Sequence, residues 1–194
     1  VNLIDGLDGL AAGVSSIASI CLMVLCILTG TESAVVFTAA LAGSCLGFLP
    51  RNFNPAEIFM GDTGATFLGY VLAVTSIMGV FKGYAVLALV VCLLSIGLPI
   101  FDTLCAMLRR AATHKPIMQA DRGHLHHKLI DRGYTQKQAV LIMYGISLVL
   151  AILAIIIAIK DSRALAVAVL MVILLSFVIF VFNNKTRLKE QRKK

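Results

Sequence analysis

Six long apolar blocks constrain this chain more than any other feature of its sequence. A helix that crosses a bilayer needs about 20 predominantly apolar residues. Since 59% of the residues are hydrophobic and 14% are charged, we expect an all-α, polytopic integral membrane protein that forms one transmembrane domain over residues 1–194. The six predicted transmembrane helices run roughly over Leu10–Leu28, Ala34–Leu49, Thr63–Phe81, Tyr84–Leu108, Ala139–Ile159 and Ala164–Phe182.

The basic residues are distributed unevenly around these blocks. The segments 50–62, 109–138 and 183–194 carry most of the 17 Lys and Arg residues, whereas the other loops carry only Lys82, Lys160 and Arg163. Short loops rich in Lys and Arg remain on the cytoplasmic side of a membrane. We therefore expect cytoplasmic loops at about 50–62 and 109–138 and a basic cytoplasmic tail at 183–194.

A first polar cluster precedes the first apolar block. Asn2, Asp5 and Asp8 recur every three residues and would share one broad face if this segment were helical. Gly6 and Gly9 would let a ligand or another backbone come close. Carboxylate and amide oxygens suit a hard divalent cation such as Mg²⁺. The alternative is a polar helix cap at the membrane surface.

A second polar cluster spans residues 51–64. Pro55 is expected to break the helix, and Asp62 then lies at the start of the third apolar block, where small neighbours leave room for a phosphate or a hydrated metal. Asp62 could instead serve only as a helix N-cap. Phe59 could offer an aromatic face to a nucleotide base, or act as an interfacial anchor.

A third cluster places His124, His126 and His127 between Arg122 and Lys128. Neither a cysteine nor a helical HExxH spacing supports a zinc site. Basic groups with a histidine that exchanges protons near neutral pH fit a diphosphate better. A basic loop that serves topology alone is the alternative.

The predicted topology places all three clusters on one face of the membrane. A transport pathway would carry polar groups near the bilayer midplane or on both faces. One-sided chemistry therefore favours a membrane enzyme that works at the cytoplasmic boundary. A cation or metabolite transporter and a non-catalytic membrane scaffold are the other classes that we consider.

Three motifs in this order resemble one known family. They are Asn2–Leu10 as NxxDGxDGL, Phe59–Gly64 as FMGDTG, and His124–His127 as HLHH. They resemble the polyprenyl-phosphate N-acetylhexosamine-1-phosphate transferases, of glycosyltransferase 4 type. The resemblance implies transfer of a sugar 1-phosphate from a UDP-N-acetylhexosamine to undecaprenyl phosphate, with release of UMP and with Mg²⁺, or alternatively Mn²⁺, as cofactor. It also implies a bacterial cytoplasmic membrane, with the active site on the cytoplasmic face.

The same resemblance implies roles for individual residues. Those roles are metal binding by Asn2 and Asp62, catalysis by Asp5, Asp8, His124, His126 and His127, and substrate binding by Asn52, Phe59, Arg122 and Lys128. The HxHH form of the histidine motif looks more like the initiators of teichoic acid and surface polysaccharide synthesis than like the peptidoglycan translocase. UDP-N-acetylglucosamine is therefore the expected donor.

One departure from the family pattern is clear. The family also carries an Asp-Asp motif on an earlier cytoplasmic loop and typically has ten or eleven helices, and this chain shows neither. We expect it to be the carboxy-terminal part of the enzyme, and we doubt activity of this part alone. Besides the two substrates, the expected partners are the lipid bilayer and a second copy of the chain in a homodimer, and no nucleic acid.

Overall fold

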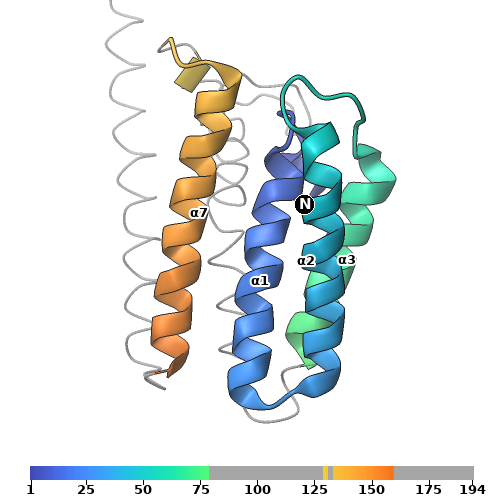
Figure 1. Ribbon diagram of the computed structural model, residues 1–194, viewed down its shortest axis with the longest axis vertical. Helices are drawn as coiled ribbons and strands as arrows, with labels where there is room; N and C mark the ends of the chain where they lie inside the picture. The colour runs from blue at the N-terminus through green and yellow to red at the C-terminus, as the bar shows by residue number, and fades with distance from the viewer. Residues whose placement is uncertain (79–128, 131–132, 160–194) are drawn as a thin grey trace, which may run out of the picture.

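The computed structural model describes residues 1–78, 129–130 and 133–159 of the chain (Figure 1). Within these ranges its elements are a 3₁₀ turn, η1 (Asn2–Ile4), and the α-helices α1 (Leu10–Thr29), α2 (Glu32–Asn52), α3 (Gly61–Met78) and α7 (Gln136–Ile159). No β-strand occurs in the described ranges. The all-α prediction is confirmed for this part of the chain, and the predicted spans at 84–108 and 164–182 lie outside it.

Three of the described helices are long and apolar enough to cross a membrane, over Leu10–Thr29, Glu32–Asn52 and Gln136–Ile156. They correspond to the first, second and fifth predicted spans. The helix α3 begins at Gly61, close to the predicted start of the third span at Thr63, and is described as far as Met78.

The second span is longer than the sequence predicts. Its helix continues through Pro50 to Asn52, and the backbone N–H of Phe53 donates a hydrogen bond of 2.7 Å to the carbonyl of Leu49. Proline removes one backbone donor, and near the end of a helix this costs little because few turns remain to be interrupted. The helix ends at Asn52 and the next begins at Gly61, so no helix passes through Pro55, as predicted.

The helix α1 lies at the centre of the described bundle, with α2 and α7 on either side of it (Figure 1). Most of its length is buried, and many of the buried residues are small, among them Ala12, Gly13 and Ser16. Small residues let helix backbones approach closely, which is how helices associate in membranes. Large apolar side chains such as Phe37 on α2 and Val149 on α7 are exposed, as expected for surfaces that face lipid.

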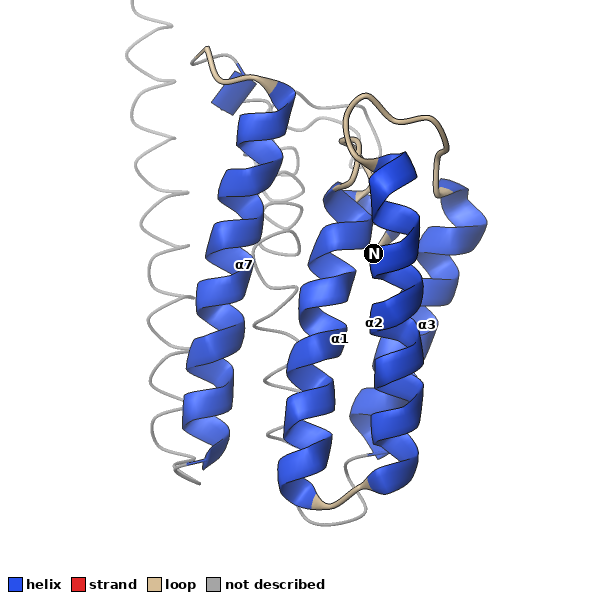
Figure 2. Ribbon diagram, viewed as in Figure 1, coloured by secondary structure: helices blue, strands red, loops and turns tan. Residues whose placement is uncertain are grey.

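The polar segments collect at one end of this bundle. Residues 5–9, the loop 53–60 and the first turns of α3 and α7 lie at the upper end in Figure 2, whereas the N-terminus lies part-way down the bundle and the tight connection between α1 and α2 lies at the lower end. Gly30 makes that connection with φ of 66°, a left-handed conformation that glycine adopts readily. For the described residues, the predicted gathering of the first two clusters at one end is confirmed.

Candidate functional site

The acidic segment 2–9 is not the continuous helix that would have placed its three polar residues on one face. Only Asn2–Ile4 are helical, and Gly9 enters α1 with φ of 81°. A right-handed helix has negative φ throughout, so Gly9 interrupts it. The predicted shared face of Asn2, Asp5 and Asp8 is therefore wrong, and the two carboxylates have different surroundings.

Asp5 lies close enough to Asp62 for the two carboxylates to repel each other. Asp5 is half-buried, and this burial raises its pKa above the ordinary value, which the charge of Asp62 raises further. Asp62 is exposed in the first turn of α3. The charge of Asp62 thus acts on Asp5, and the two carboxylates come from different acidic motifs. Such a pair favours the uptake of a cation, because a cation relieves both the repulsion and the desolvation.

This pair fits a magnesium site of the kind that substrates complete. Mg²⁺ usually binds one or two carboxylates and fills its octahedral shell with water and substrate phosphates. Among the described residues, no cluster of three or more His, Cys, Asp or Glu side chains forms a closed metal cage. Asn2 is exposed, and its carbonyl accepts a hydrogen bond of 3.2 Å from the Asp5 N–H, which links the two residues through the backbone.

Asp8 joins the acidic segment to the loop between α2 and α3. Its Oδ2 accepts hydrogen bonds from Nδ2 of Asn54 at 3.0 Å and from the backbone N–H of Ala56 at 3.2 Å. A carboxylate that accepts two donors holds a loop firmly, because charge-assisted hydrogen bonds are stronger than neutral ones. Asp8 therefore fixes the loop from outside, and one of its oxygens is already engaged.

A second set of hydrogen bonds closes the same loop from within. The carbonyl of Arg51 accepts the backbone N–H groups of Glu57 at 2.8 Å and Ile58 at 3.2 Å, and the side chains of Arg51 and Glu57 form an ion pair. Asn52 is buried, and its Nδ2 donates to the carbonyl of Ile58 at 2.9 Å. The conformation of residues 51–58 is therefore held at both ends.

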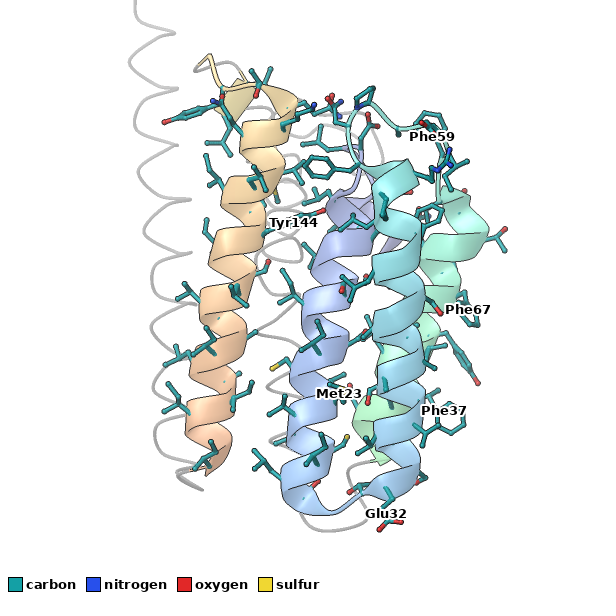
Figure 3. All side chains as sticks on the ribbon, viewed as in Figure 1. Met23, Glu32, Phe37, Phe59, Phe67 and Tyr144 are labelled. Carbon is teal, nitrogen blue, oxygen red and sulfur yellow. The ribbon has the colours of Figure 1, made fainter. Side chains whose placement is uncertain are left out.

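The side-chain oxygen of Asn52 is not paired in the way that its nitrogen is. Its Oδ1 is buried and accepts no hydrogen bond from the residues that the structure describes. A buried acceptor left unpaired costs free energy, so it is a suitable place for a donor group of a ligand. Phe59 lies on the same loop and is 76% exposed, so its ring is free to stack on a flat ligand (Figure 3).

The third predicted cluster lies outside the described residues. This holds for the histidines His124, His126 and His127 and for the basic residues Arg122 and Lys128. Their roles remain predictions. The helix α7, which begins at Gln136, starts nine residues after His127 at the end of the bundle where the acidic segment lies (Figure 1).

The sequence reasoning missed three residues that shape this end of the bundle, namely Asn54, Gly13 and Tyr144. Asn54 stood within the second polar cluster but was not singled out. The hydroxyl of Tyr144 donates a hydrogen bond to the carbonyl of Gly9. The spacing of Gly9 and Gly13, four residues apart, is a signal for a close approach in membranes. Nothing local in the sequence identifies Tyr144 as the group that approaches.

Fold and site together define a helical membrane protein that gathers two carboxylates, a buried amide oxygen and an exposed aromatic ring at one end of its bundle. Residues 1–80 match the model of the family described as Glycosyl transferase family 4. This match confirms the resemblance seen in the motifs of residues 2–10 and 59–64.

Curated relatives agree with this assignment. The chain is 41% identical over 156 residues to a probable undecaprenyl-phosphate N-acetylglucosaminyl 1-phosphate transferase of Bacillus subtilis (strain 168), covering 80% of this chain and 44% of the relative. It is 36% identical over 165 residues to a decaprenyl-phosphate N-acetylglucosaminephosphotransferase of Mycobacterium leprae (strain TN), covering 74% and 41%. It is 38% identical over 164 residues to a phospho-N-acetylmuramoyl-pentapeptide-transferase of Trichormus variabilis (strain ATCC 29413 / PCC 7937), covering 81% and 42%. The chain spans less than half the length of these relatives.

Proposed function

We propose that the protein transfers a sugar 1-phosphate from a UDP-N-acetylhexosamine to a polyprenyl phosphate. The observation that carries this proposal is the pair of hydrogen bonds that Asp8 accepts from Asn54 and Ala56, because they join the first and second polar motifs at the polar end of membrane-spanning helices. A site there can take a water-soluble nucleotide from one side and a lipid phosphate from the bilayer. The names of the relatives support the same reaction class.

The proposed reaction brings anions together. An oxygen of the lipid phosphate attacks the phosphorus that bears the sugar, and the bond to the bridging oxygen breaks, so that UMP leaves. Catalysis of such a step consists mostly of positioning and charge stabilisation. Asp5 and Asp62, with Asn2 beside them, would hold Mg²⁺, whose charge offsets that of the diphosphate. Oδ2 of Asp8 already holds the loop, so a role for Asp8 in proton transfer would fall to its other carboxylate oxygen.

The nucleotide would bind against the loop 53–60. Uracil carries one ring N–H donor and a flat face. The unpaired Oδ1 of Asn52 is an acceptor for such a donor, and the exposed ring of Phe59 can stack on such a face. Asn52 ends α2, and Phe59 lies on the following loop that Asp8 anchors, so the acidic segment and the nucleotide pocket would share one support.

We infer UDP-N-acetylglucosamine as the donor and undecaprenyl phosphate as the acceptor. The HLHH form of residues 124–127 supports this choice, as does the Bacillus subtilis relative, whose name specifies both groups. A relative that acts on phospho-N-acetylmuramoyl-pentapeptide has 38% identity, close to the 41% of the Bacillus subtilis protein. Overall sequence identity therefore does not distinguish the two donors. An enzyme assay with each donor does.

The deciding experiment uses membranes that contain the protein expressed from its complete gene. They are incubated with undecaprenyl phosphate and labelled UDP-N-acetylglucosamine, and in parallel with labelled UDP-N-acetylmuramoyl-pentapeptide. We expect labelled lipid and UMP in equal amounts from the first donor only. Labelled lipid from the second donor alone would overturn the donor assignment. If neither donor gives a lipid product or UMP, the result would favour the transporter or the scaffold.

The orientation of the bundle can be tested separately. Lys137 is exposed in the first turn of α7 at the polar end, and Glu32 is exposed at the start of α2 at the opposite end (Figure 3). If the polar end is cytoplasmic, an impermeant thiol reagent should label Glu32→Cys in whole cells, and Lys137→Cys only after the cells are opened. The unsubstituted protein provides the background labelling. The reverse pattern would place the site outside the cell, away from nucleotide sugars.

A further inference from the structure

The carbonyl of Gly9 receives two hydrogen bonds at the start of α1. One comes from the backbone N–H of Gly13 at 2.9 Å and is the first hydrogen bond of the helix. The other comes from the hydroxyl of Tyr144, which reaches across from α7 and is 135 positions away in the sequence. A carbonyl oxygen has two lone pairs, so the two donors satisfy it fully.

The surroundings of this hydrogen bond are shaped for the Tyr144 ring. A Cβ atom at Gly13 would overlap Cζ and the hydroxyl oxygen of Tyr144, which only the absence of a side chain at this position avoids. A Cβ atom at Gly9 would lie 2.9 Å from Cδ2 of Phe53 and 3.3 Å from the same hydroxyl oxygen. Two glycines one turn apart therefore form the surface on which the ring lies.

Residues 8 and 9 are the junction of three elements. The carboxylate of Asp8 holds Asn54 and Ala56 of the loop that carries Phe59. The next residue, Gly9, begins α1, packs against Phe53 and is bonded to α7 through Tyr144. At the polar end, a displacement of α7 would therefore be transmitted to Gly9, and from there to Asp8 and the loop, through the side chain of Tyr144.

We propose that Tyr144 is a positioning residue that holds the acidic segment and the loop 53–60 in register with α7. The proposal rests on the proposed transferase function. That reaction would need the carboxylates to be placed correctly relative to the segment that precedes α7. Tyr144 does not touch the reacting atoms in this account. It acts through the backbone of Gly9, and its effect should appear in turnover more than in substrate binding.

The test is Tyr144→Phe in the protein expressed from its complete gene. The ring and its packing are kept and only the hydroxyl is lost, so the protein should still fold and insert. We expect kcat to fall by about 10-fold with KM for the nucleotide sugar changed less than about twofold, since small misplacements of reacting groups cost turnover. Tyr134→Phe and Tyr70→Phe, at positions that are 45% and 68% exposed, are the matched controls and should keep wild-type kcat. An unchanged kcat in Tyr144→Phe would overturn the proposal.

A second pair of variants tests the contact itself. Gly13→Ala should lower kcat when Tyr144 is present, because the new Cβ displaces the ring, and should add little in a Tyr144→Ala background. Equal effects of Gly13→Ala in both backgrounds would contradict the proposed contact.

Hydrogen exchange gives a readout that needs no activity. Tyr144→Phe should speed exchange of the Gly13 amide and of residues 54–58, but not of residues 38–45 in the middle of α2. If the protein shows no transferase activity, the proposed function fails, and this measurement still decides the coupling. Unchanged exchange at residues 13 and 54–58 would overturn the positioning role, whatever the reaction.

Discussion

Asp62→Asn should lower turnover by about 10²-fold or more, the scale expected when one charged group that stabilises a transferring phosphate is removed. The side-chain volume hardly changes, and Asp62 is exposed in the first turn of α3, so the fold should persist. The variant should also need a higher Mg²⁺ concentration for half-maximal activity, because one anionic ligand is lost. Turnover titrated against Mg²⁺ measures both effects. Wild-type magnesium dependence would refute the metal assignment.

The same variant has a consequence for stability that needs no substrate. Burial and Asp62 raise the pKa of Asp5 in the folded protein, so the folded state binds this proton more tightly than the unfolded state does. Without Mg²⁺, stability should therefore fall as pH rises from the ordinary carboxyl range through the raised pKa of Asp5. In Asp62→Asn the loss should be smaller, because only burial still raises that pKa.

Melting temperatures of the detergent-solubilised protein, measured across this pH range with and without Mg²⁺, check the expectation. Glu32→Gln removes an exposed acid at the opposite end of the bundle and serves as the control. It should leave both the pH dependence and the magnesium response unchanged. An Asp62→Asn variant with the wild-type pH dependence would show that the two carboxylates do not interact.

The helices were predictable because hydrophobicity acts locally. A block such as residues 139–159 is apolar over a bilayer-spanning length, and an α-helix satisfies the backbone groups of such a segment within the segment itself. Helix ends were less predictable, as α2 shows. Pro50 was expected to follow the helix, yet it lies inside the last turn, because the hydrogen bond from Phe53 to Leu49 extends the helix beyond it.

The shape of the site was only partly predictable. Residue types pointed to Asp5 and Asp62 separately, and glycine at position 9 indicated a close approach. The partners came from far away in the sequence: Asn54 lies 46 positions from Asp8, and Tyr144 lies 135 positions from Gly9. Such contacts depend on how helices pack, and a single amphipathic pattern does not encode them. The backbone from Asp5 to Asp8 is not helical, so the two carboxylates are not aligned as a regular three-residue spacing in a helix would have aligned them.

The histidine loop should be as sensitive as the acidic pair. Replacing any one of His124, His126 and His127 with Ala is expected to lower turnover by about 10²-fold or more, the scale of a lost acid–base or charge-stabilising group. These residues lie outside the described part of the structure, so the expectation rests on the sequence. Rates measured at saturating substrate, with protein level determined in the same membranes, test it.

A fourth histidine in the same predicted loop provides the control. His114 lies outside the HLHH motif, and His114→Ala should keep wild-type turnover. Insertion should not change in any of these variants, because Arg122 and Lys128 still hold the loop on the cytoplasmic side. A triple variant could carry Ala in place of His124, His126 and His127. If its turnover were near normal, the loop would serve topology alone. The chemistry would then have to come from the acidic segment and Asp62, and α7 would matter to it only through Tyr144.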